Sequence, residues 1–192
     1  MKILFINPSL RRGAKTKLLP VGIGYIMTYV HENGYDFDLL DVDIDDLSDK
    51  EVESYIRKNK YDVVLSGCIV TNYKWMKWLT RVIKNYHPDT KIIVGNSVAG
   101  SAAEVFLRNS NADFAVIGEG EITALALLSA ISEGNSLEEI EGIAYLNENG
   151  VFIKKPKRKA VKKIDDFPMI NWNLFSVQKY IQTYRPSFAF TT

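Results

Sequence analysis

The sequence has one cysteine and two histidines in 192 residues, and these scarcities exclude several kinds of chemistry. The single thiol of Cys68 cannot form an internal disulfide, nor supply the several thiolates of an iron–sulfur cluster or a structural zinc site. His31 and His87 lie near the ends of predicted helices, where capping or packing is the usual role. We therefore expect no metal ligands and no catalytic residues in this chain.

The sequence also lacks an excess of either charge and any long apolar run. Lys plus Arg number 24 against 23 for Asp plus Glu, so no global field attracts nucleic acid or an anionic membrane. The longest uncharged stretch, residues 18–30, is shorter than the roughly 20 residues of a bilayer span. We expect a soluble, cytoplasmic protein without a nucleic-acid or membrane partner.

Two basic segments could still act locally. The loop at 11–17 is either a mobile cover over an anionic ligand or a solvated loop, and we favour the solvated loop. The run KKPKRKAVKK at 154–163 has no interleaved aromatics to stack on bases, which favours a solvated linker.

What the chain does contain is a series of short apolar runs alternating with helical patterns. Ser48 with Glu51 forms a capping box for one helix, and Ser101 is a candidate cap for another. Five strand–helix units in sequence predict a Rossmann-like (flavodoxin-like), doubly wound parallel α/β sheet of five strands in the order 2-1-3-4-5. The predicted strands are 2–6, 35–40, 61–67, 91–96 and 112–118, with the second at an edge.

The character of the sequence changes near residue 136, which predicts a division into residues 1–135 and 136–192. Asn149-Gly150 between two apolar segments predicts a hairpin with a two-residue turn. The connector that follows carries Phe167, Trp172 and Phe175, too many aromatics for a free linker. We expect part of it to pack on a protein surface, which another domain could supply.

Small and glycine-containing loops follow the third, fourth and fifth predicted strands, at 66–71, 95–97 and 118–121. Ligands of open parallel sheets bind beyond the carboxyl ends of the strands, where such residues let a ligand approach the backbone. Tight turns alone would explain any one of these loops. Three of them at one edge favour a binding site.

The usual motifs of this fold are missing. The residues after the first strand read NPSLRRGAKTK, which excludes a G-x-G-x-x-G turn, and no phosphate loop occurs. Asn7 and Ser66 stand where a phospho-receiver would need acidic residues. The acidic run from Asp41 has Asp46 rather than glycine at the sixth position of a calcium loop, and we interpret it as the solvated mouth of an edge strand. Cys68, after the third strand, is interpreted as a packing residue.

An ordered set of segments nevertheless resembles one known family. ILFINPS, LLPVGIGYIMTYVHENGYDFDLLDVD, YDVVLSG, KIIVGN, ADFAVIGEGEIT, LEEIEGIAYLNENG and IDDFPMINW follow one another across nearly the whole chain. Together they are similar to the N-terminal cobalamin-binding domain of cobalamin-dependent radical SAM enzymes. The GEGE turn at 118–121 and the later GIAY segment are the most specific part.

The resemblance implies that the corrin lies on the carboxyl edge of the sheet, with its nucleotide tail among the loops after the third to fifth strands. No D-x-H-x-x-G motif is present, so no lower histidine ligand to cobalt is expected. Asn96 replaces the family's usual second glycine and adds a side chain near the tail. The cofactor-binding candidates are Pro20, Val21, Gly22, Ser66, Gly67, Val70, Thr71, Gly95, Asn96, Ser97, Gly118, Glu119, Gly120, Glu121 and Thr123.

The family also implies a larger enzyme. A radical SAM domain would follow in the same polypeptide, with a C-x-x-x-C-x-x-C motif that binds a 4Fe-4S cluster and S-adenosylmethionine. This chain stops at RPSFAFTT, about where the first strand of that barrel is expected. The parent enzyme would be a methyltransferase or would perform a radical rearrangement or cyclisation, and this fragment alone would catalyse nothing.

Two other hypotheses stay open from the sequence. A degenerate Rossmann-like domain that no longer binds cobalamin would only shape the substrate path, and its loops after the third to fifth strands would be filled by their own side chains. An independent nucleotide-binding domain is the other.

Overall fold

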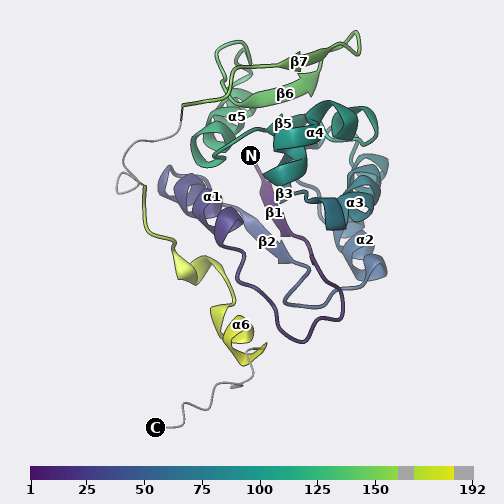
Figure 1. Cartoon of the computed structure of the whole chain (residues 1–192), viewed down its shortest axis with the longest axis vertical. Helices are drawn as coiled ribbons and strands as arrows, with labels where there is room; N and C mark the ends of the chain where they lie inside the picture. The colour runs from purple at the N-terminus through teal and green to yellow at the C-terminus, as the bar shows by residue number, and fades with distance from the viewer. Residues whose placement is uncertain (160–166, 184–192) are drawn as a thin grey trace.

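The chain folds around one seven-stranded sheet (Figure 1). The structure is a computed structural model and describes residues 1–159 and 167–183. Its strands lie in the order β2-β1-β3-β4-β5-β6-β7. They are β1 (Ile3–Asn7), β2 (Asp38–Asp41), β3 (Val63–Gly67), β4 (Lys91–Gly95), β5 (Phe114–Val116), β6 (Ile143–Leu146) and β7 (Phe152–Lys154).

The first five strands are parallel, which confirms the predicted order 2-1-3-4-5 and the edge position of the second strand. The predicted hairpin extends the same sheet: β6 pairs antiparallel with β5, and β7 with β6. Its turn is longer than the two residues predicted. Residues 147–151 connect the strands, and the Asn147 side chain accepts hydrogen bonds from the N–H groups of Asn149 and Val151.

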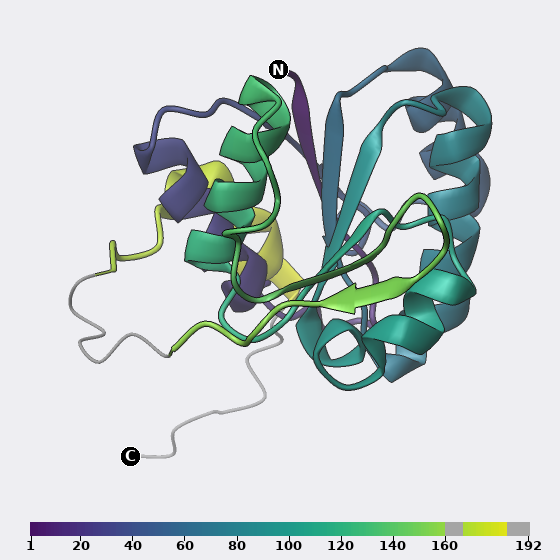
Figure 2. The same ribbon diagram turned by 90° about the horizontal axis from the view of Figure 1, so that it is seen from above.

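Helices cover both faces of the sheet (Figures 1 and 2). The helices are α1 (Val21–Glu32), α2 (Asp49–Lys58), α3 (Tyr73–Tyr86), α4 (Asn96–Arg108), α5 (Glu121–Glu133) and α6 (Val177–Thr183), with 3-10 turns η1 (Val70–Asn72) and η3 (Trp172–Leu174). Because side chains alternate along a strand, Phe5 and Leu65 face α1 and α5, while Leu4 and Val64 face α2 and α3. No helix within 1–159 and 167–183 is long and apolar enough to cross a membrane.

The two predicted helix caps have different outcomes. The capping box at Ser48 is confirmed, since the Glu51 N–H donates to Ser48 Oγ at 3.3 Å and the Ser48 N–H donates to Glu51 Oε2 at 2.8 Å. The cap at Ser101 is wrong. Helix α4 already begins at Asn96, directly after β4, and is kinked at Ala102 (φ −136°, ψ 33°). The Ser101 hydroxyl donates to the Ser97 carbonyl at 2.7 Å, in the part of α4 before the kink.

The connector packs on this chain's own first helix. Ile170 and Phe175 are buried in the core beside α1, and the Asn171 N–H donates to Thr28 Oγ1 at 2.9 Å. Gly24 permits this contact, because a Cβ there would lie 3.0 Å from the Phe175 ring. The expectation that the connector packs on a surface is confirmed, and α1 supplies that surface.

The basic run at 154–163 does not begin as a solvated linker. Lys154 ends β7, and the Lys155 N–H donates to the Ile143 carbonyl at 2.9 Å. The Pro156 carbonyl accepts from the Gly142 N–H at 2.7 Å. These backbone bonds hold the first residues of the run beside β6. Residues 160–163 of the run, and RPSFAFTT at the end of the chain, lie outside the described residues.

Candidate functional site

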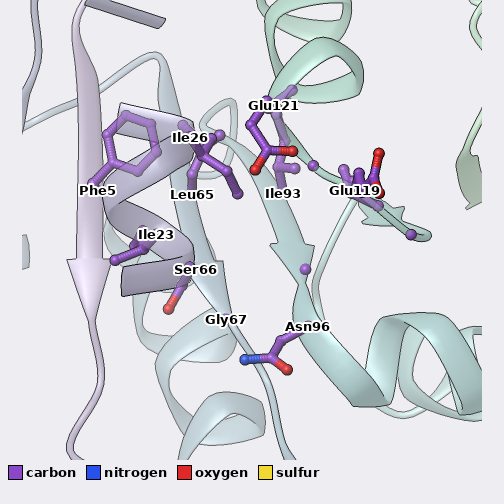
Figure 3. A pocket seen from close by; sticks show the side chains of 16 residues that line it. Phe5, Ile23, Ile26, Leu65, Ser66, Gly67, Ile93, Asn96, Glu119 and Glu121 are labelled. Atoms are coloured by element: carbon purple, nitrogen blue, oxygen red, sulfur yellow. The ribbon is translucent and has the colours of Figure 1, made fainter. Parts of the chain in front are cut away.

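A pocket of about 300 Å³ opens at the carboxyl edge of the sheet, between the strands and helices α1 and α5 (Figure 3). Its floor is the apolar face of four neighbouring strands, and α1 and α5 supply the walls. The floor and wall residues that sequence reasoning did not name are Phe5, Ile23, Ile26, Leu65, Ile93, Val116 and Ala124.

The pocket exists because β3 and β4 end in glycine, and the chain after β5 reaches Gly118 two residues beyond the strand, on the side of the sheet that faces α1 and α5. Leu65, Ile93 and Val116 lie on that face. Gly67 and Gly95, two residues further along β3 and β4, face the same way, and Gly118 also lines the pocket. Gly67 and Gly95 are direct partners in the β3–β4 register. A sequence search for an apolar residue followed two positions later by glycine, in three successive strands, would have found this floor.

Nine of the fifteen predicted residues line the pocket: Gly22, Ser66, Gly67, Gly95, Asn96, Gly118, Glu119, Gly120 and Glu121. The loops after β3, β4 and β5 therefore meet as expected, because parallel strands end at one edge. A pocket this open differs from the filled loops that the degenerate-domain hypothesis requires.

The other six predicted residues do not line it: Pro20, Val21, Val70, Thr71, Ser97 and Thr123. Val70 is 81% exposed in η1. Thr123 is buried in α5, where its hydroxyl donates to the Glu141 carbonyl at 3.3 Å. Ser97 lies exposed at the start of α4, with its N–H bonded to Asn96 Oδ1 at 2.6 Å.

The two glycines of the GEGE turn lie close to side chains of other segments, and the backbone of Gly118 also favours glycine. Gly118 has φ +90°, and a Cβ there would lie 2.7 Å from Lys157 Cε. A Cβ at Gly120 would lie 2.8 Å from Ile26 Cδ1. The turn therefore lies against Lys157 of the basic segment and against Ile26 of α1.

Some polar groups in and beside the pocket have hydrogen-bond partners and one does not. The Ser66 hydroxyl donates to the Ile6 carbonyl at 2.9 Å. Below the β3 loop, Asn72 Oδ1 accepts from the Ile69 N–H at 2.8 Å and fixes the loop. Glu121 Oε2, in contrast, is buried and has no hydrogen-bond partner among the described residues. A ligand group could satisfy this oxygen.

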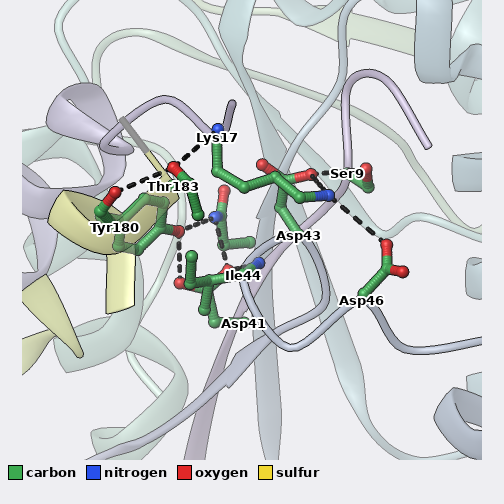
Figure 4. A network of polar contacts seen from close by, with 9 residues as sticks. Ser9, Lys17, Asp41, Asp43, Ile44, Asp46, Tyr180 and Thr183 are labelled. Atoms are coloured by element: carbon green, nitrogen blue, oxygen red, sulfur yellow. Dashed lines mark hydrogen bonds and ion pairs between the residues drawn. The ribbon is translucent and has the colours of Figure 1, made fainter. Parts of the chain in front are cut away.

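A second polar cluster lies at the ends of β1 and β2 and reaches α6 (Figure 4). Tyr180 Oη donates to Asp41 Oδ2 at 2.5 Å. Asn7 Nδ2 donates to Asp41 Oδ1 at 2.8 Å and to Tyr180 Oη at 3.0 Å. Desolvation by burial raises the pKa of Asp41, and the hydrogen bonds from Tyr180 and Asn7 oppose this increase.

The interpretation of the acidic run as a solvated mouth was wrong for its first two carboxylates. Asp41 and Asp43 are buried, because the connector and the loop after β1 cover them. Asp43 Oδ1 accepts from Ser9 Oγ at 2.5 Å and from Lys17 Nζ at 3.3 Å. Lys17 is itself buried, so the basic loop is anchored at its end rather than solvated throughout.

Asp41→Asn is expected to change how stability depends on pH. Since burial raises its pKa above the ordinary 3.8, folded Asp41 keeps its proton where the unfolded chain has released it. The contribution of Asp41 to the free energy of unfolding is complete below pH 3.8, the ordinary pKa of the group. It is lost as the pH rises through the raised pKa of the folded state. The free energy of unfolding of both proteins is measured with urea from about pH 4 to about pH 7. The value for the wild type minus the value for Asp41→Asn should decrease as the pH rises. A constant or increasing difference would contradict this assignment.

Cys68 is a packing residue, as predicted. Its side chain is fully buried among apolar residues on the opposite face of the sheet, and burial raises the pKa of the thiol to about 12. A thiol in this state is a poor nucleophile.

A family model and several curated relatives match the chain. The model described as "B12 binding domain" matches residues 10–128. The uncharacterized methyltransferase PH0819 of Pyrococcus horikoshii is 27% identical over 185 residues, which cover 94% of this chain and 40% of that protein. The anaerobic magnesium-protoporphyrin IX monomethyl ester cyclase of Synechocystis is 25% identical over 187 residues, 94% of this chain and 37% of that protein. The chain thus spans about two fifths of the length of these relatives.

Several solved structures share the fold, among them those of two radical SAM enzymes. The cobalamin-dependent S-adenosylmethionine radical enzyme OxsB, with aqua-cobalamin and S-adenosylmethionine bound, matches with a TM-score of 0.78 and 17% identity, over 95% of this chain and 25% of that chain. The radical S-adenosylmethionine methyltransferase TsrM of Kitasatospora setae, with cobalamin and a [4Fe-4S] cluster bound, matches with a TM-score of 0.69 and 16% identity. The match covers 87% of this chain and 30% of that chain.

Proposed function

The chain belongs to the B12-binding domain family, as its motifs predicted, and we propose that its pocket holds the nucleotide tail of cobalamin. The corrin ring would then lie over the carboxyl edge of the sheet. The observation that carries this proposal is the pocket itself, with apolar strands below, helices on two sides and three glycine-containing loops at its mouth. Concave, mostly apolar pockets with a few polar groups are typical of cofactor sites.

The residues present fit such a group. Gly95 has open space where a side chain would stand, and its strand partner Gly67 also places backbone at the mouth, so a bulky ligand can approach there. Phe5, Ile26 and similar apolar side chains would exclude water from the base. Bound cobalamin supplies redox-active cobalt chemistry, while these residues bind and orient the cofactor.

For the whole protein we propose a radical SAM enzyme whose catalytic domain lies outside this chain. The domain division at 135/136 and the connector leading to a radical SAM domain remain part of this proposal. The named activities of the relatives, methyl transfer and cyclisation, support these two reaction classes for the parent. A 4Fe-4S cluster and S-adenosylmethionine would belong to that further domain, as they accompany cobalamin in the solved relatives.

Titration of the 192-residue chain with hydroxocobalamin tests the proposed function. We expect a saturable change in the visible spectrum of the cobalamin and binding heat that fits a single site, because one pocket takes one nucleotide tail. Serum albumin at the same concentration serves as the control for unspecific adsorption. The absence of both signals would contradict cobalamin binding.

A further inference from the structure

Glu121 places a carboxylate in a pocket whose floor and walls are mainly apolar, and Ser66, Asn96 and Glu119 are the other polar side chains that line it. It is the first residue of α5, and its carboxyl group points into the pocket toward Ile26 and Ile93 (Figure 3). Oε2 is buried and without a hydrogen-bond partner among the residues that the structure describes. No described Lys or Arg forms an ion pair with Glu121; the nearby Arg158 directs its guanidinium to Thr123 and Glu141.

A buried carboxylate oxygen without a donor is costly, because it has lost its water and gained nothing in exchange. The positive end of the α5 helix dipole favours negative charge at Glu121. It does not supply a hydrogen bond to Oε2. The pocket is therefore better suited to a ligand that brings a donor than to one that offers only apolar surface and acceptors.

Cobamides are the class of cofactors to which cobalamin belongs. The bases in their nucleotide tails differ in whether they carry an N–H donor. The dimethylbenzimidazole of cobalamin has one ring nitrogen bonded to the ribose and one bare acceptor nitrogen, so in its neutral form it has no N–H to donate. Adenine in the same position has an exocyclic amine with two N–H groups. A hydrogen bond to a charged acceptor is stronger than one between neutral groups.

We propose that Glu121 makes this pocket selective for cobamides whose base carries an N–H donor, over the dimethylbenzimidazole of cobalamin. This inference rests on the proposed function and adds the ligand class that the site prefers. Glu121 acts as a specificity residue: it accepts the hydrogen bond of the base and does not contact the cobalt chemistry.

The test compares three probes by titration: adeninyl cobamide, cobalamin, and cobinamide, which lacks the nucleotide tail. The wild-type chain should bind adeninyl cobamide about tenfold more tightly than cobalamin, the ratio that one hydrogen bond to a charged group supports. Glu121→Met keeps an unbranched side chain of similar length without the oxygen atoms. In this variant the preference should disappear because adeninyl cobamide binds more weakly, while the affinity for cobalamin does not fall.

Glu133→Met is the matched control, since Glu133 lies at the other end of α5 and outside the pocket. It should keep the tenfold preference. Equal affinity of the two cobamides for the wild-type chain would overturn the inference without a variant having to fold. An equal loss for both cobamides in Glu121→Met would also overturn it, because Glu121 would then contact the ribose shared by the two tails. If none of the three probes binds, the proposed function itself fails.

Discussion

Replacing Gly95 by leucine should lower the affinity for cobalamin by about 100-fold, or about 2.8 kcal/mol, and leave the chain folded. Gly95 ends β4 on the same face as Ile93, so a side chain at this position points into the pocket. Its φ of −112° and ψ of −163° are extended values that any residue adopts, and an ideal Cβ has no neighbour within 4 Å. Leucine would therefore fill the space proposed for the nucleotide tail without straining the backbone.

The measurement is a cobalamin titration of both proteins, with thermal unfolding to show that the variant is folded. Gly100→Leu is the matched control, because Gly100 is exposed in α4, has equally open space around an added Cβ, and lies outside the pocket. The control should bind like the wild type. If Gly95→Leu also binds like the wild type, the tail does not occupy this pocket.

Truncating Tyr180 to alanine should lower the free energy of unfolding by about 3–5 kcal/mol. Tyr180 is fully buried, and its hydroxyl bonds with both Asp41 and Asn7. The substitution removes the packing of the ring and takes one hydrogen-bond donor from the buried Asp41 carboxylate. Loss of both would destabilise the attachment of α6 to the ends of β1 and β2.

Urea unfolding of two further variants separates these contributions. Tyr180→Phe keeps the ring but loses the hydroxyl, and it should lower the free energy of unfolding by about 1–3 kcal/mol. Ile181→Ala changes the next residue, which is 53% exposed, and should stay within about 0.5 kcal/mol of the wild type. A Tyr180→Ala variant as stable as the wild type would show that α6 adds nothing to the folded state.

Local sequence patterns determined the architecture of the parallel sheet. Five short apolar runs separated by helical periodicity were enough for the strand order, since right-handed crossovers leave few arrangements for such a series. The capping box at Ser48 was equally readable, because both of its partners lie within four residues. The glycine-containing loops were found for the same reason: strand ends are local, and parallel strands end at one edge.

Only the tertiary structure decided which side chains surround the ligand site and which acidic groups are buried. The walls of the pocket come from α1 and α5, and no local pattern distinguishes Ile26 as a wall residue from an ordinary core residue. Asp41 looked solvated because Tyr180, 139 positions later, carries no periodic signal that assigns it to the same cluster. Sequence patterns report local backbone preference and the alternation of buried faces. Contacts between distant segments depend on how whole elements pack, so the pocket and the Asp41–Tyr180 cluster became visible only in the folded chain.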